Sequence, residues 1–379
     1  MANYLRILQL IIAFWCVFYP VLALNNCDFP ALFNFGDSNS DTGGFSAAFE
    51  APLPPYGETY FGKPAGRFSD GRLTIDFIAE TFGLPYLSAY LDSVGSNFTT
   101  GANLATGGST IRPQPSLPLG RFSPFYLNIQ YSQFLQLKSR SLLFSKKGGF
   151  FKTLLPKEDY FDRALYTFDI GQNDLTAAFL DKKSTSEIKA SIPDMLSNFS
   201  ANIKALYDQG GRSFWIHNTG PIGCLPYIFV NLPVTQLDNA GCAANFNGVA
   251  QYFNLKLKDA VVQLRKDLTL AAITYVDIYT VKYTLISNAN KYGFKHPLVA
   301  CCGSGGKYNY NGKAGCGATI NVNGTKVVVG SCKTPSTRVN WDGIHYTEAA
   351  NKWVFEQIVD GKFSDPPTPL KMACPVAVG

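Results

Sequence analysis

Residues 31–44 read ALFNFGDSNSDTGG, a short apolar run that stops abruptly at glycine, aspartate and serine. The run Ala31–Phe35 is typical of a buried strand, because it is mostly apolar, contains two aromatic residues and is bounded by turn-forming residues. Ser38 follows the strand-end glycine, so we expect it at a sharp turn from which its hydroxyl can project into a cleft. Gly-Asp-Ser is also ordinary turn chemistry, and this segment alone does not identify a nucleophile.

Beyond this first strand, short apolar runs alternate with longer amphipathic stretches. We expect further strands at Gly101–Thr106, Ala164–Ile170, Ser213–Asn218 and Ala271–Asp277. We expect helices at Leu73–Phe82, Asn128–Lys146, Glu187–Asp208, Ala243–Asp267 and Glu348–Val359. Strands that alternate with helices form a parallel sheet through right-handed crossovers, with helices on both faces. The fold class is therefore α/β, a three-layer αβα sandwich with a central parallel sheet.

Three chemically useful segments follow predicted strands, and a fourth lies near the C-terminus. Functional groups in such sheets collect at the carboxyl ends of the strands. Ser38 follows the first strand, Gly107-Gly108 the second and Gly171-Gln172-Asn173-Asp174 the third. In Asp342-Gly343-Ile344-His345, the spacing lets the carboxylate hold Nδ1–H of the imidazole while Nε2 faces a nucleophile. Each segment alone has a structural explanation, but together they supply a nucleophile, a base, its orienting acid and oxyanion donors for acyl transfer.

The sequence resembles the plant branch of the GDSL lipase/esterase family, within the SGNH hydrolases, over nearly the whole mature chain. The matching segments are FNFGDSNSDTGG (33–44), GKPAGRFSDGRLTIDFIAE (62–80), GANLATGGSTI (101–111), GQND (171–174), HNTGPIGCLP (217–226), ACCG (300–303) and DGIHYTEAA (342–350). Asn39 stands where the leucine that gives the family its name often lies. This difference leaves the catalytic groups intact and bears only on the shape of the pocket.

The resemblance implies a role for each site residue. Ser38 is then the nucleophile, and Asp342 and His345 complete a triad. The backbone N–H of Ser38 forms the oxyanion hole with Gly108 and Asn173, although Gly107 could present the backbone N–H instead of its neighbour. The implied fold is flavodoxin-like, and no cofactor is expected.

Residues 1–23 have the pattern of a secretory signal peptide, with Arg6, an apolar run over 7–18 and a small-residue end at Val21-Leu22-Ala23. The apolar run is too short to span a bilayer, and no later segment is apolar for long enough. We therefore expect a single SGNH/GDSL hydrolase domain over 24–379, secreted to the apoplast or cell wall, without stable membrane insertion. The proline-rich stretch Ser364–Pro369 is expected to form a C-terminal tail.

Cysteines and sequons agree with a secreted protein. Of nine cysteines, eight remain once Cys16 leaves with the signal peptide, and an even number in a secreted chain predicts disulfides. We expect those within 301–332 to staple a long loop, without predicting the pairing. No CxxC pair occurs and the three histidines are far apart, so we expect no metal site. Glycosylation sequons begin at Asn97, Asn198 and Asn323.

Several other patterns favour structural roles. Asp41-Thr42-Gly43 resembles half of an aspartic-protease motif, but no second copy exists, so we expect Asp41 at a turn or helix start. We expect Asp70 to cap the helix that begins near Leu73, and His217 to be a packed, hydrogen-bonded residue. The formal net charge of +6 is scattered without a basic stripe, so a nucleic-acid partner is not expected.

The function that these observations favour is a serine esterase acting through an acyl-enzyme. We expect carboxylic esters with short or aromatic acyl groups on polar alcohols, sugars, polysaccharides or plant metabolites. An acyltransferase would use the same triad with a hydroxyl acceptor, and a non-catalytic glycan-binding or defence protein would retain only the fold. A glycosidase would need a carboxylate pair from the set Asp37, Asp41, Glu58 and Asp70, but no pair stands out. The sequence does not indicate an oligomeric state.

Overall fold

The computed structural model describes residues 26–114 and 122–375, so the predicted signal peptide lies outside the described residues. The central sheet has the strand order β2-β1-β3-β4-β5-β8. Its strands are β1 (Leu32–Gly36), β2 (Gly101–Asn103), β3 (Leu165–Asp169), β4 (Ser213–His217), β5 (Ala272–Val276) and β8 (Ser364–Asp365). The first five pair in parallel, whereas β8 pairs antiparallel with β5 at one edge. The predicted parallel sheet is thus confirmed, with one short antiparallel addition.

Side chains of the central strands alternate between two apolar cores. On β1, Phe33 and Phe35 belong to one core and Leu32 to the other, and on β4 Phe214 and Trp215 divide in the same way. This alternation follows from the period of two along a strand. Both faces are apolar because both are covered by helices, as is usual for parallel sheets.

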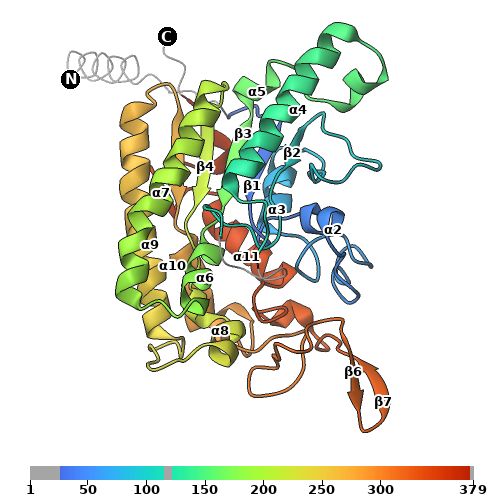
Figure 1. The fold of residues 1–379 in the computed structure, drawn as a ribbon, viewed down its shortest axis with the longest axis vertical. Helices are drawn as coiled ribbons and strands as arrows, with labels where there is room; N and C mark the ends of the chain where they lie inside the picture. The colour runs from blue at the N-terminus through green and yellow to red at the C-terminus, as the bar shows by residue number, and fades with distance from the viewer. Residues whose placement is uncertain (1–25, 115–121, 376–379) are drawn as a thin grey trace, which may run out of the picture.

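Helices cover the sheet in two layers (Figure 1). The first core is completed by α4 (Leu127–Lys147), α7 (Thr185–Asp208) and α9 (Ala244–Asp267). The second is completed by α3 (Thr74–Thr81), α10 (Ile278–Ser287) and α11 (Glu348–Ile358). Shorter helices α2 (Gly44–Ala48), α5 (Tyr160–Arg163), α6 (Gln172–Leu180) and α8 (Pro226–Asn231) lie in the connections. The three-layer αβα sandwich is therefore confirmed.

The C-terminal segment differs from its expected role as a tail. Ser364 and Asp365 form β8, and Leu370 is buried in the second core. The disulfide Cys27–Cys374 then ties this segment to the start of the described chain. The prolines suggested a tail because they disfavour central strands, yet an edge strand tolerates them.

Disulfides staple the segment over 301–332, as predicted from its cysteines. The pairs are Cys301–Cys332 and Cys302–Cys316, with Cys224–Cys242 elsewhere in the described chain. Between the paired cysteines, β6 (Thr319–Val322) and β7 (Thr325–Val328) form a hairpin that projects from the body of the molecule (Figure 1). Its turn, Asn323-Gly324, has φ values of 52° and 85°, and Asn-Gly is a strong hairpin signal.

Candidate active site

The turn after β1 holds Ser38 at the carboxyl edge of the sheet. The N–H of Asp37 donates to the carbonyl of Asp169 at the end of β3, over 3.1 Å. Gln130 on α4 brackets Gly36, since its Oε1 accepts the Gly36 N–H at 2.9 Å and its Nε2 donates to the Gly36 carbonyl at 2.8 Å. A Cβ on Gly36 would lie 2.6 Å from the Asp169 carbonyl oxygen. Glycine is therefore required for this close approach, which fixes the path of the chain into Ser38.

Ser38, His345 and Asp342 form a continuous hydrogen-bonded chain. The His345 Nε2 atom lies 2.7 Å from Ser38 Oγ, and its Nδ1 lies 2.6 Å from Asp342 Oδ2. The other oxygen of Asp342 accepts the backbone N–H groups of Ile344 and His345. All three side chains are buried, with residues no more than 8% exposed. The structure thus brings together the residues that the sequence singled out, 307 positions apart for serine and histidine.

The loop that carries His345 is shaped by a glycine and a stacked ring. Gly343 has a φ of 102°, and a Cβ there would lie 2.1 Å from the Tyr310 ring. Its N–H donates to Asn340 Oδ1 at 2.7 Å. Phe68 stacks on the imidazole with ring centroids 5.1 Å apart and planes inclined by 26°. These contacts limit the rotation of His345 about its side-chain bonds.

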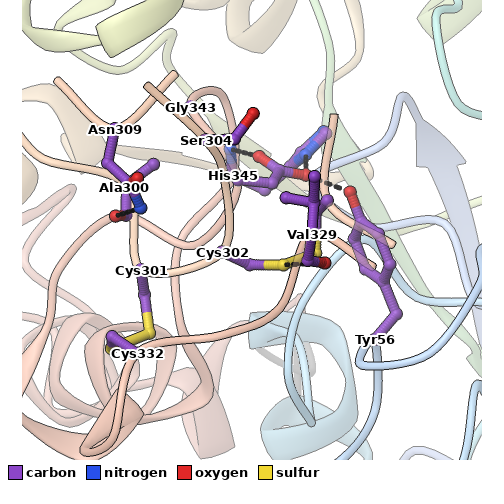
Figure 2. Close-up of a disulfide and its surroundings, with 12 residues drawn as sticks. Tyr56, Ala300, Cys301, Cys302, Ser304, Asn309, Val329, Cys332, Gly343 and His345 are labelled. Atoms are coloured by element: carbon purple, nitrogen blue, oxygen red, sulfur yellow. Dashed lines mark hydrogen bonds and ion pairs between the residues drawn. A yellow bond between two sulfur atoms is a disulfide. The ribbon is translucent and has the colours of Figure 1, made fainter. Parts of the chain in front are cut away.

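Tyr56 is a contributor that the sequence reasoning missed. Its hydroxyl donates to Asp342 Oδ2 at 2.8 Å, the oxygen that also faces the imidazole (Figure 2). Its ring forms T-shaped pairs with Trp341 and Phe68, with ring centroids 5.9 and 6.2 Å apart. No sequence motif indicates this role. The tyrosine lies in a proline-rich turn, and it comes into contact with Asp342 only in the folded protein.

Two backbone N–H groups near the triad, those of Ser38 and Gly108, have no acceptor among the described residues. Within the described ranges, neither the Ser38 N–H nor the Gly108 N–H donates a hydrogen bond to the protein. The Gly107 N–H, in contrast, donates to Asp41 Oδ2 at 2.7 Å. Gly108 also has a φ of 77°, a conformation that favours glycine. Of the two glycines, Gly107 has its N–H bound to Asp41, so the geometry favours Gly108 as the donor, and its role in an oxyanion hole stays a prediction.

A model of the family described as "GDSL-like Lipase/Acylhydrolase" matches residues 32–358. The chain belongs to this GDSL family. It is 58% identical to the GDSL esterase/lipase ENOD8 of Medicago truncatula, covering 99% of this chain and 97% of that protein. An esterase of Hevea brasiliensis is 60% identical, with 95% and 92% covered. A protein named alpha-L-fucosidase 3 from Arabidopsis thaliana is 54% identical, with 90% and 93% covered.

A solved structure that is similar to this GDSL protein is phospholipase A1 from Streptomyces albidoflavus. It shares 12% identity with a TM-score of 0.38, over 88% of this chain and 99% of that chain.

Asn173 lies on the first turn of α6, at the rim predicted for it in the GDSL fold. Its Nδ2 donates to the Ser109 carbonyl at 2.9 Å and contacts Asp37 Oδ2 over a longer 3.3 Å. The amide nitrogen thus donates to two protein acceptors, which orient the Asn173 side chain at this edge of the sheet.

The carboxylates around Ser38 have displaced pKa values. Burial, aided by the negative charge of Asp169, raises the pKa of Asp37 to about 7. Burial opposes ionisation of Asp342 as well, but the charge and hydrogen bonds of His345 hold its pKa below the ordinary value. Asp342 is therefore suited to remain a carboxylate beside the imidazole, as an orienting acid requires.

His217 is packed and hydrogen-bonded, as predicted. Its Nε2 accepts from Trp215 Nε1 at 3.1 Å and its Nδ1 lies 3.2 Å from Asp169 Oδ2. These partners indicate the neutral tautomer with hydrogen on Nδ1. Nearby, the ammonium of the buried Lys282 lies 4.5 Å from the ring centroid of Tyr346. Burial lowers the pKa of Lys282, while the negative charges of Asp169 and Asp37 oppose that shift.

Asp41 and Asp70 have structural roles, one as expected and one different. The Asp41 carboxylate accepts N–H groups at the start of α2, from Gly43, Gly44 and Phe45, which confirms the predicted helix-start role. Asp70 was expected to cap the helix near Leu73, and this was wrong. Its carboxylate instead accepts the Glu348 N–H at the start of α11, at 2.7 Å. The carboxylate that accepts the Leu73 N–H is Asp76, three residues into the helix that it caps.

The predicted glycosylation sites lie at exposed or half-buried positions of the described chain. Asn97 and Asn323 are exposed, whereas Asn198 is half-buried on α7. No helix among the described residues is long and apolar enough to cross a membrane. Those same residues contain no cluster of histidine, cysteine and acidic side chains that could hold a metal ion.

Proposed function

We propose that this chain is a serine esterase that hydrolyses carboxylic esters through an acyl-enzyme on Ser38. The observation that carries the proposal is the unbroken hydrogen-bonded chain from Ser38 Oγ through His345 to Asp342. A neutral serine is a weak nucleophile, and a base within 2.7 Å is what activates it. The family and its relatives named esterase support the same reaction class.

The first half-reaction forms the acyl-enzyme. His345 Nε2 takes the Ser38 proton while Oγ bonds to the ester carbonyl carbon, and Asp342 stabilises the imidazolium. The carbonyl oxygen becomes an oxyanion that accepts hydrogen bonds from the N–H groups of Ser38 and Gly108 and from the Asn173 amide. The carbon–oxygen bond to the alcohol then breaks, and His345 passes its proton to the leaving oxygen.

The second half-reaction releases the acid. A water molecule gives its proton to His345 Nε2 and attacks the acyl carbon, and the same donors stabilise the second oxyanion. The bond from the acyl carbon to Ser38 Oγ breaks, and the serine recovers its proton from His345. If a hydroxyl of another molecule attacks in place of water, the product is a new ester and the enzyme is an acyltransferase.

We assign to this site esters with short or aromatic acyl groups on polar alcohols, sugars, polysaccharides or plant metabolites. An apolar pocket of about 810 Å³ lies beside Gly108 and is large enough to hold an aromatic acyl group. The name of one relative, alpha-L-fucosidase 3, is a reason to consider the glycosidase alternative again. The carboxylates of Asp41 and Asp70 each accept backbone N–H groups at a helix start. This structural role argues against the two aspartates acting as a catalytic acid/base pair.

Secretion is part of the same proposal. Four disulfides among the described residues are typical of proteins that fold in an oxidising compartment. The signal-peptide pattern over 1–23 and the sequons at Asn97, Asn198 and Asn323 agree with export to the apoplast or cell wall.

The experiment compares the protein with its Ser38→Ala variant on p-nitrophenyl acetate, butyrate and palmitate. We expect the variant to lose at least about 10⁴-fold in kcat, as serine hydrolases do without their nucleophile. Equal activity of the two proteins would remove Ser38 from the mechanism. A parallel reaction with glycerol added, analysed for free acid and for transferred acyl groups, separates hydrolysis from acyl transfer.

A further inference from the structure

Aromatic residues are the largest single group among those that line the pocket beside Gly108. It encloses about 810 Å³, and its aromatic walls come from Phe45, Phe49, Tyr56, Phe68, Phe122 and Tyr126. Prolines and small residues supply most of the remaining lining, with Leu53 as the one branched aliphatic side chain among the pocket's described residues. Aromatic rings and prolines have few rotatable bonds. The pocket walls are therefore flat and adapt little to the shape of a flexible aliphatic chain.

The pocket opens at the point where an ester carbonyl would be held. Gly107 and Gly108 form part of its wall, and the Gly108 N–H is the available backbone donor beside Ser38. Phe68 lines the pocket and also stacks on His345. The pocket therefore adjoins the proposed oxyanion donor Gly108 and the ring that stacks on His345.

The disulfide-stapled segment supplies one side of this pocket. Gly315, Cys316 and Ala318 line it, and Cys316 is held by its bond to Cys302. Gly317 packs so closely on the turn that carries Tyr56 that a Cβ there would lie 2.8 Å from the Pro54 carbonyl oxygen. Figure 2 shows Cys302 and Tyr56 in the same close-up around His345. This side of the pocket is thus fixed covalently.

We propose that this pocket binds an aromatic acyl group of the ester substrate. The inference rests on the proposed function and selects the aromatic alternative over the short one. Aromatic rings favour edge-to-face and offset contacts with other rings, and the pocket walls already show this geometry. Phe45 meets Phe68 edge-on at 5.4 Å and Phe49 at a tilt at 5.0 Å. A planar acyl group fits such walls, whereas an acetyl group would fill little of the volume.

The acyl side of the ester, and not its alcohol, occupies the pocket for a chemical reason. The leaving oxygen must face His345 Nε2 to receive its proton, so the alcohol leaves past the imidazole. The acyl carbon remains beside the oxyanion donors in both half-reactions. The pocket wall includes Gly108, whose N–H is the proposed donor to the oxyanion formed from the acyl carbonyl, and this neighbour favours the acyl group as the occupant.

The test measures kcat/KM for p-nitrophenyl cinnamate, octanoate and acetate, each divided by its rate of hydroxide hydrolysis. We expect cinnamate to exceed both acetate and octanoate by at least about 10-fold, a ratio typical of a filled apolar pocket. Phe49→Ala, at a ring that is 49% exposed, should lower the cinnamate-to-acetate ratio about 5-fold. Ala318→Trp, which fills the pocket, should lower the same ratio further. Phe150→Ala, at a ring that is 71% exposed and outside the pocket, is the matched control and should leave the ratio unchanged.

Three results would overturn the proposal. Preference for octanoate would assign the pocket to an aliphatic chain. An unchanged cinnamate-to-acetate ratio in both pocket variants would place the acyl group elsewhere. Sensitivity of 2-naphthyl acetate, but not of cinnamate, to Phe49→Ala would place the alcohol in the pocket. In each case acetate hydrolysis that still depends on Ser38 would leave the proposed esterase function standing, so the two failures are distinguishable.

Discussion

The hydroxyl of Tyr56 donates to Asp342 Oδ2 at 2.8 Å, and His345 Nδ1 lies 2.6 Å from that same oxygen. Two donors therefore share one carboxylate oxygen, while the other oxygen accepts backbone N–H groups. Burial and the nearby Asp342 charge raise the pKa of Tyr56 well above its ordinary value, so the tyrosine remains a donor. The arrangement fixes the carboxylate and moderates its basicity toward the imidazole.

Replacing Tyr56 by phenylalanine should lower kcat about 5- to 10-fold, the net cost of one ordinary hydrogen bond. Without this donor, Asp342 Oδ2 interacts more strongly with protonated His345. The acid limb of the pH–rate profile should therefore move to higher pH. Measuring kcat/KM at a series of pH values would detect this shift.

Tyr60→Phe is the control for that substitution, because the Tyr60 hydroxyl bonds to Tyr86 on an exposed surface. It should leave both the rate and the pH profile unchanged. If Tyr56→Phe lowers the rate without moving the acid limb, the hydroxyl acts only on the packing of the site and not on the Asp342 charge.

Replacing Asn173 by alanine should reduce kcat about 10²- to 10³-fold with little change in KM, because oxyanion donors act mainly in the transition state. Asn288→Ala, at the exposed end of α10, provides a comparison in which kcat should not change. Initial-rate kinetics on p-nitrophenyl acetate give both constants. A rise in KM at constant kcat would show that Asn173 binds the ground state equally well and would remove it from the oxyanion hole.

The free energy of unfolding should fall as the pH rises from about 4 to 7. Burial raises the pKa of Asp37 and of Asp174 from 3.8 to about 7. Between those values the native state keeps protons that the unfolded state has lost, so the unfolded state gains stability with pH. Urea unfolding at pH 4.5 and 7.5 measures the difference, and Asp174→Asn should flatten it. Equal or greater stability at pH 7.5 would contradict the assigned protonation.

Expression in a secretory host should yield a glycoprotein with sugars at Asn97, Asn198 and Asn323. Substituting each asparagine by glutamine should remove one step from the mobility shift produced by an endoglycosidase, as seen on a denaturing gel. The absence of any shift in the unsubstituted protein would contradict passage through the secretory pathway.

Much of the fold could be predicted because local pattern and tertiary structure agree. The strand ending at Gly36 and the helix Thr185–Asp208 both lie within a few residues of their predicted bounds. The helix Ile278–Ser287 was missed because it follows β5 almost directly and is apolar on much of its surface. The hairpin around Asn323 was treated as loop because its strands are exposed, although the Asn-Gly pair was a usable signal.

In the candidate site, too, the residues in local motifs could be predicted, whereas those that depend on tertiary contacts could not. Ser38, Asp342 and His345 were found because each lies in a short segment whose residue types and spacing indicate a catalytic role. Tyr56 was not found, since its role depends on a contact across 286 residues of chain. The ring-lined pocket likewise depends on loops that meet only in the folded protein.

The most direct test of the account is to trap the acyl-enzyme. The protein is mixed with p-nitrophenyl acetate, quenched with acid within the first turnover and digested for peptide mass mapping. We predict one acetyl group, on Ser38, together with a burst of one equivalent of p-nitrophenol that disappears in Ser38→Ala. An acetyl group on another residue, or an undiminished burst from the variant, would contradict it.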